Sequence, residues 1–324
     1  MSKTFLGVDA GATKTHALIL NEDGAVLGFG ESGPGNHESF GYEAAGKCIG
    51  DSIRQACAEA SLEISDLTQS CFCLAGADVD SDFETLPEVM LRPIMGESPF
   101  LLKNDAFGCL RGGTKDPFGV MVNCGTAQVA VGRNREGKEI RLGGYGFEFG
   151  DFAGGGVIAM WAACALIREE DGRGEPTRLS ALLRERAQVS NAAEFLNKTY
   201  RDPEFFASLK IPKLVFLASR EGDPIAKKIV LDCAEEMAVT AVALIRRLKM
   251  EEEVFDLVTA GSVFKGEDPD FIESIQKTVH SVAPKARFTM PLFDPVAGAA
   301  LLAFEDAGLV ADEAVYKQLE AFKL

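Results

Sequence analysis

The stretch that decides the fold is GVDAGATKT, residues 7–15. Apolar residues lead into it at 5–8 and out of it at 17–20, so the pattern predicts a strand, a tight turn and a second strand. Its small residues and its Lys-Thr pair suggest a phosphate-binding loop. The P-loop and the dinucleotide fingerprint have another glycine spacing, and both open a helix. We therefore predict a glycine-rich hairpin whose backbone amides bind phosphate, with Asp9 at its mouth.

A second stretch of the same design follows at VMVNCGTAQVAVG, residues 120–132. When the two are aligned, Asn123 takes the place of Asp9, and Gly125 takes the place of Gly11. We interpret this as an internal duplication in which each hairpin opens its own domain. Buried strands and helices alternate elsewhere, which is typical of α/β layers. We expect domains at 1–113 and 114–324, with the last helix packing back on the first domain.

Composition excludes several functions. The 324 residues are 47% apolar and 25% charged, as in an ordinary soluble globular protein. A net charge of −16 repels nucleic acid and anionic membranes, and no apolar stretch has the length and low charge of a membrane span. We expect no signal peptide before the first strand, and a cytoplasmic protein. The eight cysteines lie mostly in apolar runs, which favours buried thiols over a metal cluster.

Polar or small residues stand where several predicted strands end. Asp9 and Asn123 end the leading strands of the hairpins, Asp105 follows PFLLKN, and Gly261 follows FDLVTA. Ligands of α/β proteins bind at the carboxyl ends of strands, so these residues are site candidates. Hydrated Mg²⁺ takes one or two carboxylates plus phosphate oxygens, which suits Asp9. The alternative is that Asp9 caps its own turn.

Asp105 is the candidate general base. Phosphoryl transfer to an alcohol depends mainly on positioning and charge, and a carboxylate beside the acceptor hydroxyl accepts its proton. The alternative role for Asp105 is to cap the helix predicted over FGCLRGG, and one residue can do both.

The glycine-rich segment LGGYGFEFGDFAGGG, residues 142–156, is a candidate sugar-binding loop. Tyr145 offers an aromatic face to a sugar ring. Asp151 could cap a helix or accept hydrogen bonds from sugar hydroxyls. Asn36, in the loop GPGNHES, offers a further amide.

The motifs GVDAGATKT, GNHES, KNDA, NCGT, GGYGFEFGD, EGDP and AGSVFKG occur in an order that resembles the N-acetylglucosamine kinase and BadF/BadG ATPase family of the actin, Hsp70 and sugar-kinase superfamily. The resemblance covers nearly the whole chain. It implies two ribonuclease H-like α/β domains, each a five-stranded mixed sheet flanked by helices, with a cleft between them. It also implies ATP and Mg²⁺ between the hairpins, an amino sugar deeper in the cleft, transfer to the C6 hydroxyl, and a homodimer.

The resemblance gives each candidate residue a role by position. Asp105 corresponds to the catalytic base, and Asp9 to the carboxylate on the metal side. The sugar contacts would be Asn36, Gln128, Gly144, Tyr145, Gly146 and Asp151. The nucleotide contacts would be Gly11, Thr13, Lys14, Gly125, Thr126, Ala218, Gly261 and Lys265.

Some residues depart from the family pattern. Ala127 and Gln128 replace a glycine and a small residue in the second hairpin, and Phe152 replaces the Glu of a Glu-Gly-Ser motif. Tyr145 and Phe147 stand where Trp and His are common. Two alternatives to an amino-sugar kinase therefore stay open. One is a BadF-type ATPase that activates a partner enzyme through an iron–sulfur cluster, which the apolar surroundings of the cysteines disfavour; the other is a non-catalytic sugar-binding protein.

Overall fold

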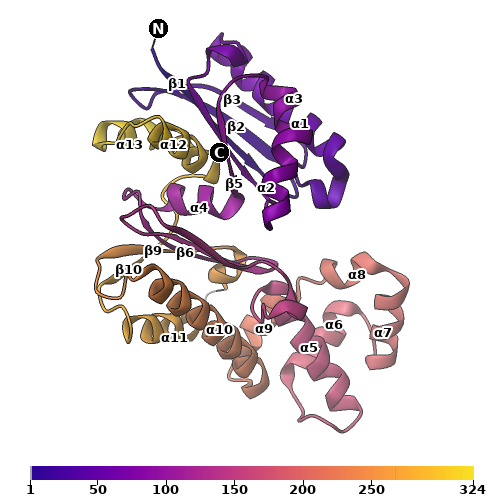
Figure 1. Cartoon of the computed structure of the whole chain (residues 1–324). Coiled ribbons are helices and arrows are strands. Elements are labelled where there is room, and N and C mark those ends of the chain that lie inside the picture. Colours follow the sequence, from indigo (N-terminus) through magenta and orange to yellow (C-terminus); the bar gives the residue numbers. More distant parts are fainter. Residues whose placement is uncertain (1, 267) are drawn as a thin grey trace.

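The computed structural model describes residues 2–266 and 268–324, which form two α/β units stacked one above the other (Figure 1). The first sheet has the strand order β3-β2-β1-β4-β5. Its strands are β1 (Thr4–Ala10), β2 (Thr15–Asn21), β3 (Val26–Ser32), β4 (Gln69–Leu74) and β5 (Phe100–Asn104). The first three strands pair antiparallel, as the hairpin pattern predicts, and β4 and β5 continue the sheet in parallel.

The second sheet repeats this topology in the order β10-β9-β6-β7-β8. Its strands are β6 (Gly119–Cys124), β7 (Gln128–Arg133), β8 (Glu139–Gly143), β9 (Phe255–Ala260) and β10 (Ala286–Thr289). Each sheet is therefore a hairpin meander extended by two parallel strands on the side of its first strand, as the duplication predicts.

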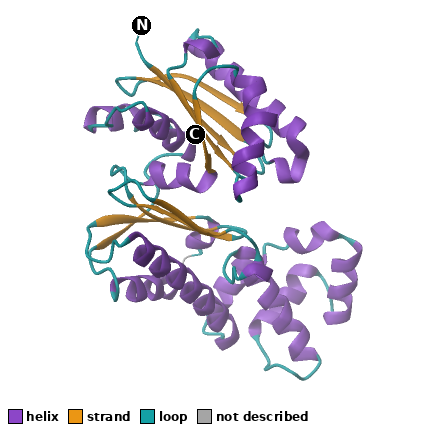
Figure 2. Cartoon of the chain, in the orientation of Figure 1, coloured by secondary structure: helices purple, strands orange, loops and turns teal. Residues whose placement is uncertain are grey.

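Helices cover both faces of the first sheet (Figure 2). Those on one face and in the linking segments are α1 (His37–Ala60), η1 (Ile64–Asp66), α2 (Asp80–Leu86), the π-helical η2 (Pro87–Leu91) and α3 (Arg92–Met95). The second unit has a larger helical insertion between β8 and β9. It comprises η3 (Phe147–Phe149), α5 (Gly155–Glu170), α6 (Arg178–Ala187), α7 (Ala192–Arg201), α8 (Pro203–Ser208), α9 (Ile211–Arg220) and α10 (Pro224–Leu248).

The remaining helices are α4 (Asp105–Gly113), η4 (Ser262–Lys265), α11 (Pro269–His280), α12 (Pro295–Asp306) and α13 (Glu313–Leu319). Within 2–266 and 268–324, none of the helices has the length and apolar character that crossing a membrane requires.

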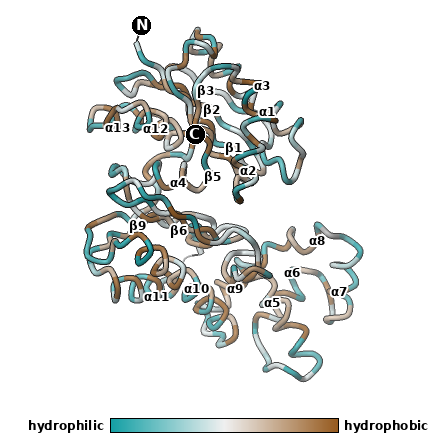
Figure 3. Tube along the Cα trace, viewed as in Figure 1, coloured by the Kyte–Doolittle hydropathy of each residue, from teal (hydrophilic) through white to brown (hydrophobic). Residues whose placement is uncertain are grey.

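Two helices, α4 and α12, each follow one sheet in the chain but pack against the other sheet; we call them the exchanged helices. α4 follows β5 of the first sheet, but its Ala106 and Leu110 pack with Met121 and Val131 of the second. α12 follows the second sheet, but its apolar residues share a core with Phe5 and the other first-sheet strands. Buried side chains occupy α12 along most of its length, consistent with its hydrophobic character (Figure 3). We propose that 1–113 and 114–324 are the two domains, with α12 and α13 completing the core of the first.

The exchanged helices touch at glycines. A Cβ atom on Gly298 of α12 would lie 2.0 Å from the carbonyl oxygen of Gly108 in α4, and one on Gly7 would lie 2.1 Å from the amide nitrogen of Ala300. Real Cβ atoms do not approach backbone atoms this closely, so these positions accept only a hydrogen atom as a side chain.

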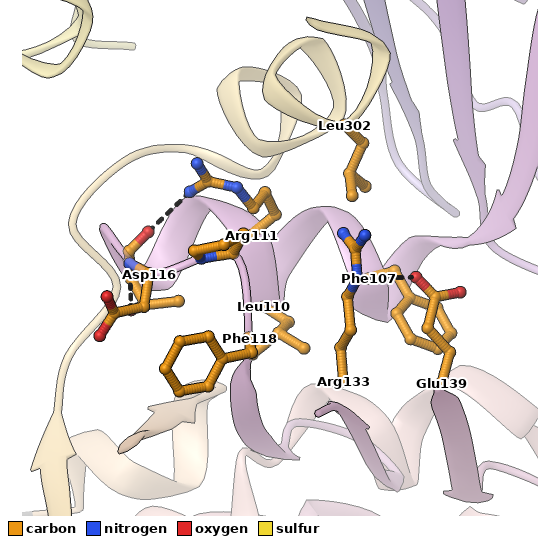
Figure 4. A pocket seen from close by; sticks show the side chains of 10 residues that line it. Phe107, Leu110, Arg111, Asp116, Phe118, Arg133, Glu139 and Leu302 are labelled. Carbon is orange, nitrogen blue, oxygen red and sulfur yellow. Dashed lines mark hydrogen bonds and ion pairs between the residues drawn. The ribbon is translucent and has the colours of Figure 1, made fainter. Parts of the chain in front are cut away.

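Beside this crossing lies a buried ion pair. Arg111 of α4, 3% exposed, donates from Nε to Glu305 of α12 at 2.7 Å and from Nη2 to the Tyr316 hydroxyl at 2.8 Å. Arg133 of β7 lies 3.3 Å from Glu305. It also lies 3.9 Å from Glu139, and Figure 4 shows these two side chains. The two units are therefore joined by charge pairs as well as by close backbone packing.

We predict opposite effects for two Gly→Ala substitutions inside helices. Gly298→Ala should lower the free energy of unfolding by about 1–3 kcal/mol, because the added methyl group overlaps the α4 backbone. Gly46→Ala in α1 should raise it by about 0.5–1 kcal/mol, since the nearest atom to its Cβ is 3.9 Å away and alanine favours the helix. Urea unfolding measures the free energy of unfolding of both variants. Equal changes for the two would contradict the close contact between the α4 and α12 backbones.

Candidate functional site

The two predicted hairpins form, but their glycine amides are engaged. The Gly11 amide donates to the Lys14 carbonyl at 3.0 Å, and the Gly125 amide donates to the Ala127 carbonyl at 3.0 Å. These bonds close the turns and leave residues 12–14 and 126–127 exposed at the tips. Amides that bind phosphate would therefore have to come from these tips, where Thr13, Lys14 and Thr126 lie.

Acidic side chains gather below the first hairpin. The pKa of Asp9 is raised to about 7, mainly by burial and also by the nearby Asp105 and Asp294 carboxylates, while Lys14 lowers it. Asp294 is the residue before α12, and its side chain does not cap that helix. The sequence reasoning missed Asp294, although a polar residue before Pro295 at the start of an apolar helix is a recognisable signal.

The acidic side chains around Asp9 suit the binding of a hydrated magnesium ion. In the described part of the chain, no three His, Cys, Asp or Glu side chains form a ready-made metal site. Mg²⁺ usually keeps several waters and binds phosphate oxygens together with one or two carboxylates. Asp9, whose ionised form is destabilised by neighbouring carboxylates, can supply one such ligand.

Asp105 is the first residue of α4, and the alternative that it caps this helix is wrong. Asn104 is the N-cap, and its side-chain oxygen accepts the Ala106 amide at 3.1 Å. The Asp105 carboxylate is therefore not the cap, although the Ala106 backbone amide also acts on it. Burial raises the pKa of Asp105, while a hydrogen bond from the Ala106 backbone and the charge of Arg141 lower it. An aspartate in such surroundings can accept a proton at the helix N-terminus.

A polar cavity of about 220 Å³ surrounds Asp105. One wall comes from the first unit, with Asn36, Asp78 and Asn104, and the other comes from the second unit, with Arg141. Five predicted site residues line it together: Asn36, Asp105, Thr126, Gln128 and Gly144.

The predicted residues Tyr145, Gly146 and Asp151 do not line this cavity and are instead linked to one another. Asp151 accepts the amides of Tyr145 at 2.6 Å and Gly146 at 2.7 Å, and the Gln128 side chain at 3.2 Å. Because α5 begins only at Gly155, Asp151 does not cap a helix. Its carboxylate shapes the turn that places Gly144 at the cavity.

Phe147 and Phe152, two aromatic residues that depart from the family pattern, pack against each other. Phe147 contacts Phe152 with ring centroids 5.2 Å apart, and it contacts Trp161 of α5 at 6.5 Å. All three rings remain partly exposed beside the loop.

Two larger cavities adjoin the hairpins. The first, of about 910 Å³, is lined by Asn123, Gly261, Lys265 and Asp294, among others. The second, of about 690 Å³, is lined by residues of α9 and η4, and Lys265 borders both. Gly261 has φ +100°, and a Cβ there would lie 2.4 Å from the Cys124 backbone, so this glycine lets β9 end tightly against the second hairpin.

Ala218, a predicted nucleotide contact, lies on the face of α9 that packs into the core, and its side chain is fully buried. The opposite face of α9 lines the cavity with Lys213, Phe216 and Arg220. These residues recur at helical spacing, a signal that the sequence reasoning did not use.

The cysteines lie away from an exposed cluster site. Cys71 and Cys73 are buried with sulfur atoms 4.0 Å apart, and Cys124 and Cys233 are buried with sulfur atoms 3.9 Å apart. These thiols are parts of hydrophobic cores, which disfavours an iron–sulfur cluster held at a surface.

The raised pKa of Asp9 predicts a pH-dependent stability. The folded pKa of about 7 exceeds the unfolded value of 3.8, so wild type loses stability as pH rises between these values, by up to about 1.4 kcal/mol per pH unit. Asp9→Asn cannot ionise and should be stabilised relative to wild type at pH 8 but much less at pH 5. Urea unfolding of both proteins from pH 5 to pH 8 tests this.

The matched control is Asp51→Asn at the surface of α1. Hydrogen bonds from Lys47 and Arg54 lower the pKa of Asp51, so its titration lies below this pH range. Its stability difference from wild type should stay constant from pH 5 to pH 8. A constant difference for Asp9→Asn as well would contradict the raised pKa.

Comparison with known proteins places the chain among ATPases and sugar kinases. N-acetyl-D-glucosamine kinase from Dictyostelium discoideum is 31% identical over 318 residues, which cover 94% of this chain and 98% of the relative. N-acetylmuramic acid/N-acetylglucosamine kinase from Clostridium acetobutylicum is 29% identical over 304 residues, which cover 93% and 98%.

Solved structures confirm the predicted fold class of two five-stranded α/β units. A Chromobacterium violaceum protein proposed to be an N-acetylglucosamine kinase has a TM-score of 0.67 at 22% identity, over 93% of this chain and 99% of that one. The ROK family glucokinase from Streptomyces griseus, in complex with glucose and AMPPNP, has a TM-score of 0.56 at 17% identity, over 94% and 100%.

The family assignment comes from the sequence itself. The BadF/BadG/BcrA/BcrD ATPase family model matches residues 6–303, which is most of the chain and includes both hairpins and the cavity around Asp105. The chain therefore belongs to the BadF/BadG/BcrA/BcrD ATPase family.

Proposed function

We propose that this protein is an ATP-dependent kinase that phosphorylates an amino sugar, N-acetylglucosamine or a close relative, at the C6 hydroxyl. The observation that carries the proposal is the Asp105 carboxylate at the start of α4, which lines a sugar-sized polar cavity beside the second hairpin. The two curated relatives described above are both kinases of N-acetylated amino sugars.

The nucleotide would occupy the two larger cavities. Lys213, Arg220 and Lys265 offer positive charge for phosphates, and Pro212 is an apolar residue of the same cavity. Thr13 and Thr126 at the hairpin tips add hydroxyl donors. Asp9 would hold Mg²⁺, and Asp294 is a second carboxylate that acts on Asp9. The ion would neutralise charge on the phosphate oxygens.

Asp105 would act on the acceptor hydroxyl. As the sugar oxygen attacks the γ-phosphorus, its proton passes to the Asp105 carboxylate, and the bond from phosphorus to the ADP oxygen breaks. Burial keeps the Asp105 pKa above its ordinary value, so the carboxylate is basic enough to accept this proton. The positive charge of Arg141 opposes that shift and helps Asp105 remain ionised near neutral pH.

The sugar would be oriented by groups on both cavity walls. The Asn36 side-chain oxygen already accepts the Glu38 amide at 2.8 Å, so its amide nitrogen is the group that can donate to a sugar oxygen. Because Gly144 has no side chain, its backbone would lie close to the sugar. The homodimer implied by the resemblance and the cytoplasmic location expected from the sequence remain predictions.

The proposal predicts ADP release from Mg-ATP that depends on an amino sugar. In a coupled assay over N-acetylglucosamine, N-acetylmuramic acid, glucosamine and glucose, we expect the highest kcat/KM with an N-acetylated sugar. Asp105→Asn should lower kcat about 10²–10⁴-fold, because the base is lost, while calorimetry shows unchanged sugar binding.

The surface variant Asp51→Asn serves as the control and should match wild type. Sugar binding without ADP release for any sugar would favour the non-catalytic alternative. Near-normal turnover of Asp105→Asn would show that another group accepts the proton.

The proposed nucleotide cavity predicts a separate effect on ATP. Lys213→Met should raise the KM for ATP about tenfold, as expected for losing one charge-assisted contact, and should leave the KM for sugar unchanged. Lys228→Met is the matched control, because Lys228 on α10 is exposed and pairs with Asp232 away from the cavity. Equal ATP KM values for the two variants would contradict this placement of the nucleotide.

A further inference from the structure

Two charged side chains of β8 form ion pairs with residues of the first unit. Glu139 and Arg141 are two residues apart on the strand and therefore point to the same face. Lys103 of β5 lies 2.6 Å from Glu139, and Arg141 lies 3.0 Å from Asp78, in the loop between β4 and α2. Both ion pairs join strands that border the proposed sugar cavity.

The Arg141–Asp78 pair is held at two points. Arg141 Nη2 pairs with the Asp78 carboxylate, and Nη1 donates to the Asp78 carbonyl oxygen at 3.1 Å. The two side chains are 11% and 20% exposed, so the pair is largely shielded from solvent. The planar fork of arginine suits such a two-point contact, and lysine cannot reproduce it.

Asp78 also contacts Asn104, the residue that caps α4, and α4 begins at Asp105. The Asn104 side-chain nitrogen donates to the same Asp78 carboxylate oxygen at 2.7 Å. The side-chain oxygen of Asn104 caps α4 through the Ala106 amide. A continuous chain of polar contacts thus runs from β8 to the helix turn that presents Asp105.

On its other side, Arg141 packs against the sugar-binding loop. Its guanidinium carbon lies 4.9 Å from the centroid of the Tyr145 ring. A Cβ atom on Gly144 would lie 2.4 Å from Arg141 Nη2, so the loop follows the arginine closely. Asp78, Asn104, Asp105, Arg141 and Gly144 all line the same cavity.

We propose that Arg141 is a positioning residue for phosphoryl transfer, which through Asp78 fixes the sugar-binding wall against the Asp105 end of α4. This inference rests on the proposed kinase function and adds to it a residue pair to which neither the sequence motifs nor the family resemblance gave a role. The acceptor hydroxyl is bound by both walls, so its distance from Asp105 depends on this pair. Displacements of about 1 Å can cost about 10²-fold in rate.

The pair also sets the charge around the base. The titratable and charged groups that face Asp105 are Asp9 on β1, Asp78 in the β4–α2 loop, Arg141 on β8 and the Cys109 thiol on α4. Arg141 lowers the pKa of Asp105, while the Asp105 carboxylate raises the pKa values of Asp9, Asp78 and Cys109. Removing Arg141 should therefore raise the pKa of Asp105.

The test compares steady-state kinetics and kcat–pH profiles of Arg141→Met, Arg141→Lys and Asp78→Asn, with N-acetylglucosamine and Mg-ATP. Arg141→Met should lower kcat about 10²-fold with the KM for ATP within twofold, and should move the acid limb of the profile to higher pH. Asp78→Asn should also lower kcat, because it removes the carboxylate that joins Arg141 to Asn104. In Arg141→Lys the acid limb should stay at the wild-type pH, because the positive charge is kept. Its kcat should fall to about a tenth of the wild-type value, because lysine cannot make the two-point contact.

Arg135→Met is the matched control. Arg135 is an exposed arginine of the second unit, 3.1 Å from Glu253 and away from the cavity, and its loss should change none of these parameters. Equal kcat values and acid limbs for Arg141→Met and Arg135→Met would overturn the proposal. So would a fall in kcat that merely follows a loss of folded protein, measured by circular dichroism.

A second measurement does not depend on catalysis. In wild type and variants without substrate, amide hydrogen exchange should be faster in Arg141→Met than in Arg135→Met at residues 104–108 and 143–146. Unchanged exchange at both segments would overturn the positioning role. If wild type phosphorylates no sugar, the proposed function fails, while the exchange result still decides whether Arg141 couples the two cavity walls.

Discussion

The crossing of α4 and α12 is the contact on which the rest of the structure depends. Each helix continues from one sheet and packs on the other, so neither unit completes its core alone. Gly108 and Gly298 let the helix backbones meet, and the buried Arg111–Glu305 pair fixes their relative position. α4 also begins at Asp105 and α12 follows Asp294, so the contact that joins the units also places two acidic residues of the site.

The site therefore concentrates negative charge where the two units meet. Asp105 and Asp294 both act on Asp9, and burial raises the pKa of Asp9 and of Asp105. Such an arrangement costs stability in the protein alone but suits a bound cation and a proton acceptor. Arg141 and Lys14 oppose this charge from different sides, at the proposed sugar cavity and the first hairpin respectively.

Local sequence signals indicate where a residue lies when its position follows from its own strand or turn. Asp105 follows an apolar strand and Gly144 lies in a glycine-rich loop, and the structure brings both to one cavity. Asp151 is predicted near the site, and in the structure its oxygens accept neighbouring amides of the loop. The side chain of Ala218 is buried in the core, and a motif position alone does not say which face of a helix points to a ligand.

The sequence by itself determined two glycine hairpins, their duplication and the α/β class, because hydrophobic periodicity and turn residues act over a few positions. Only the tertiary structure decided which helix completes which sheet, that Asp294 lies beside Asp9, and that Arg141 meets Asp78. These contacts join residues from distant parts of the chain. No local period records them, and they exist only once both sheets and the exchanged helices have packed.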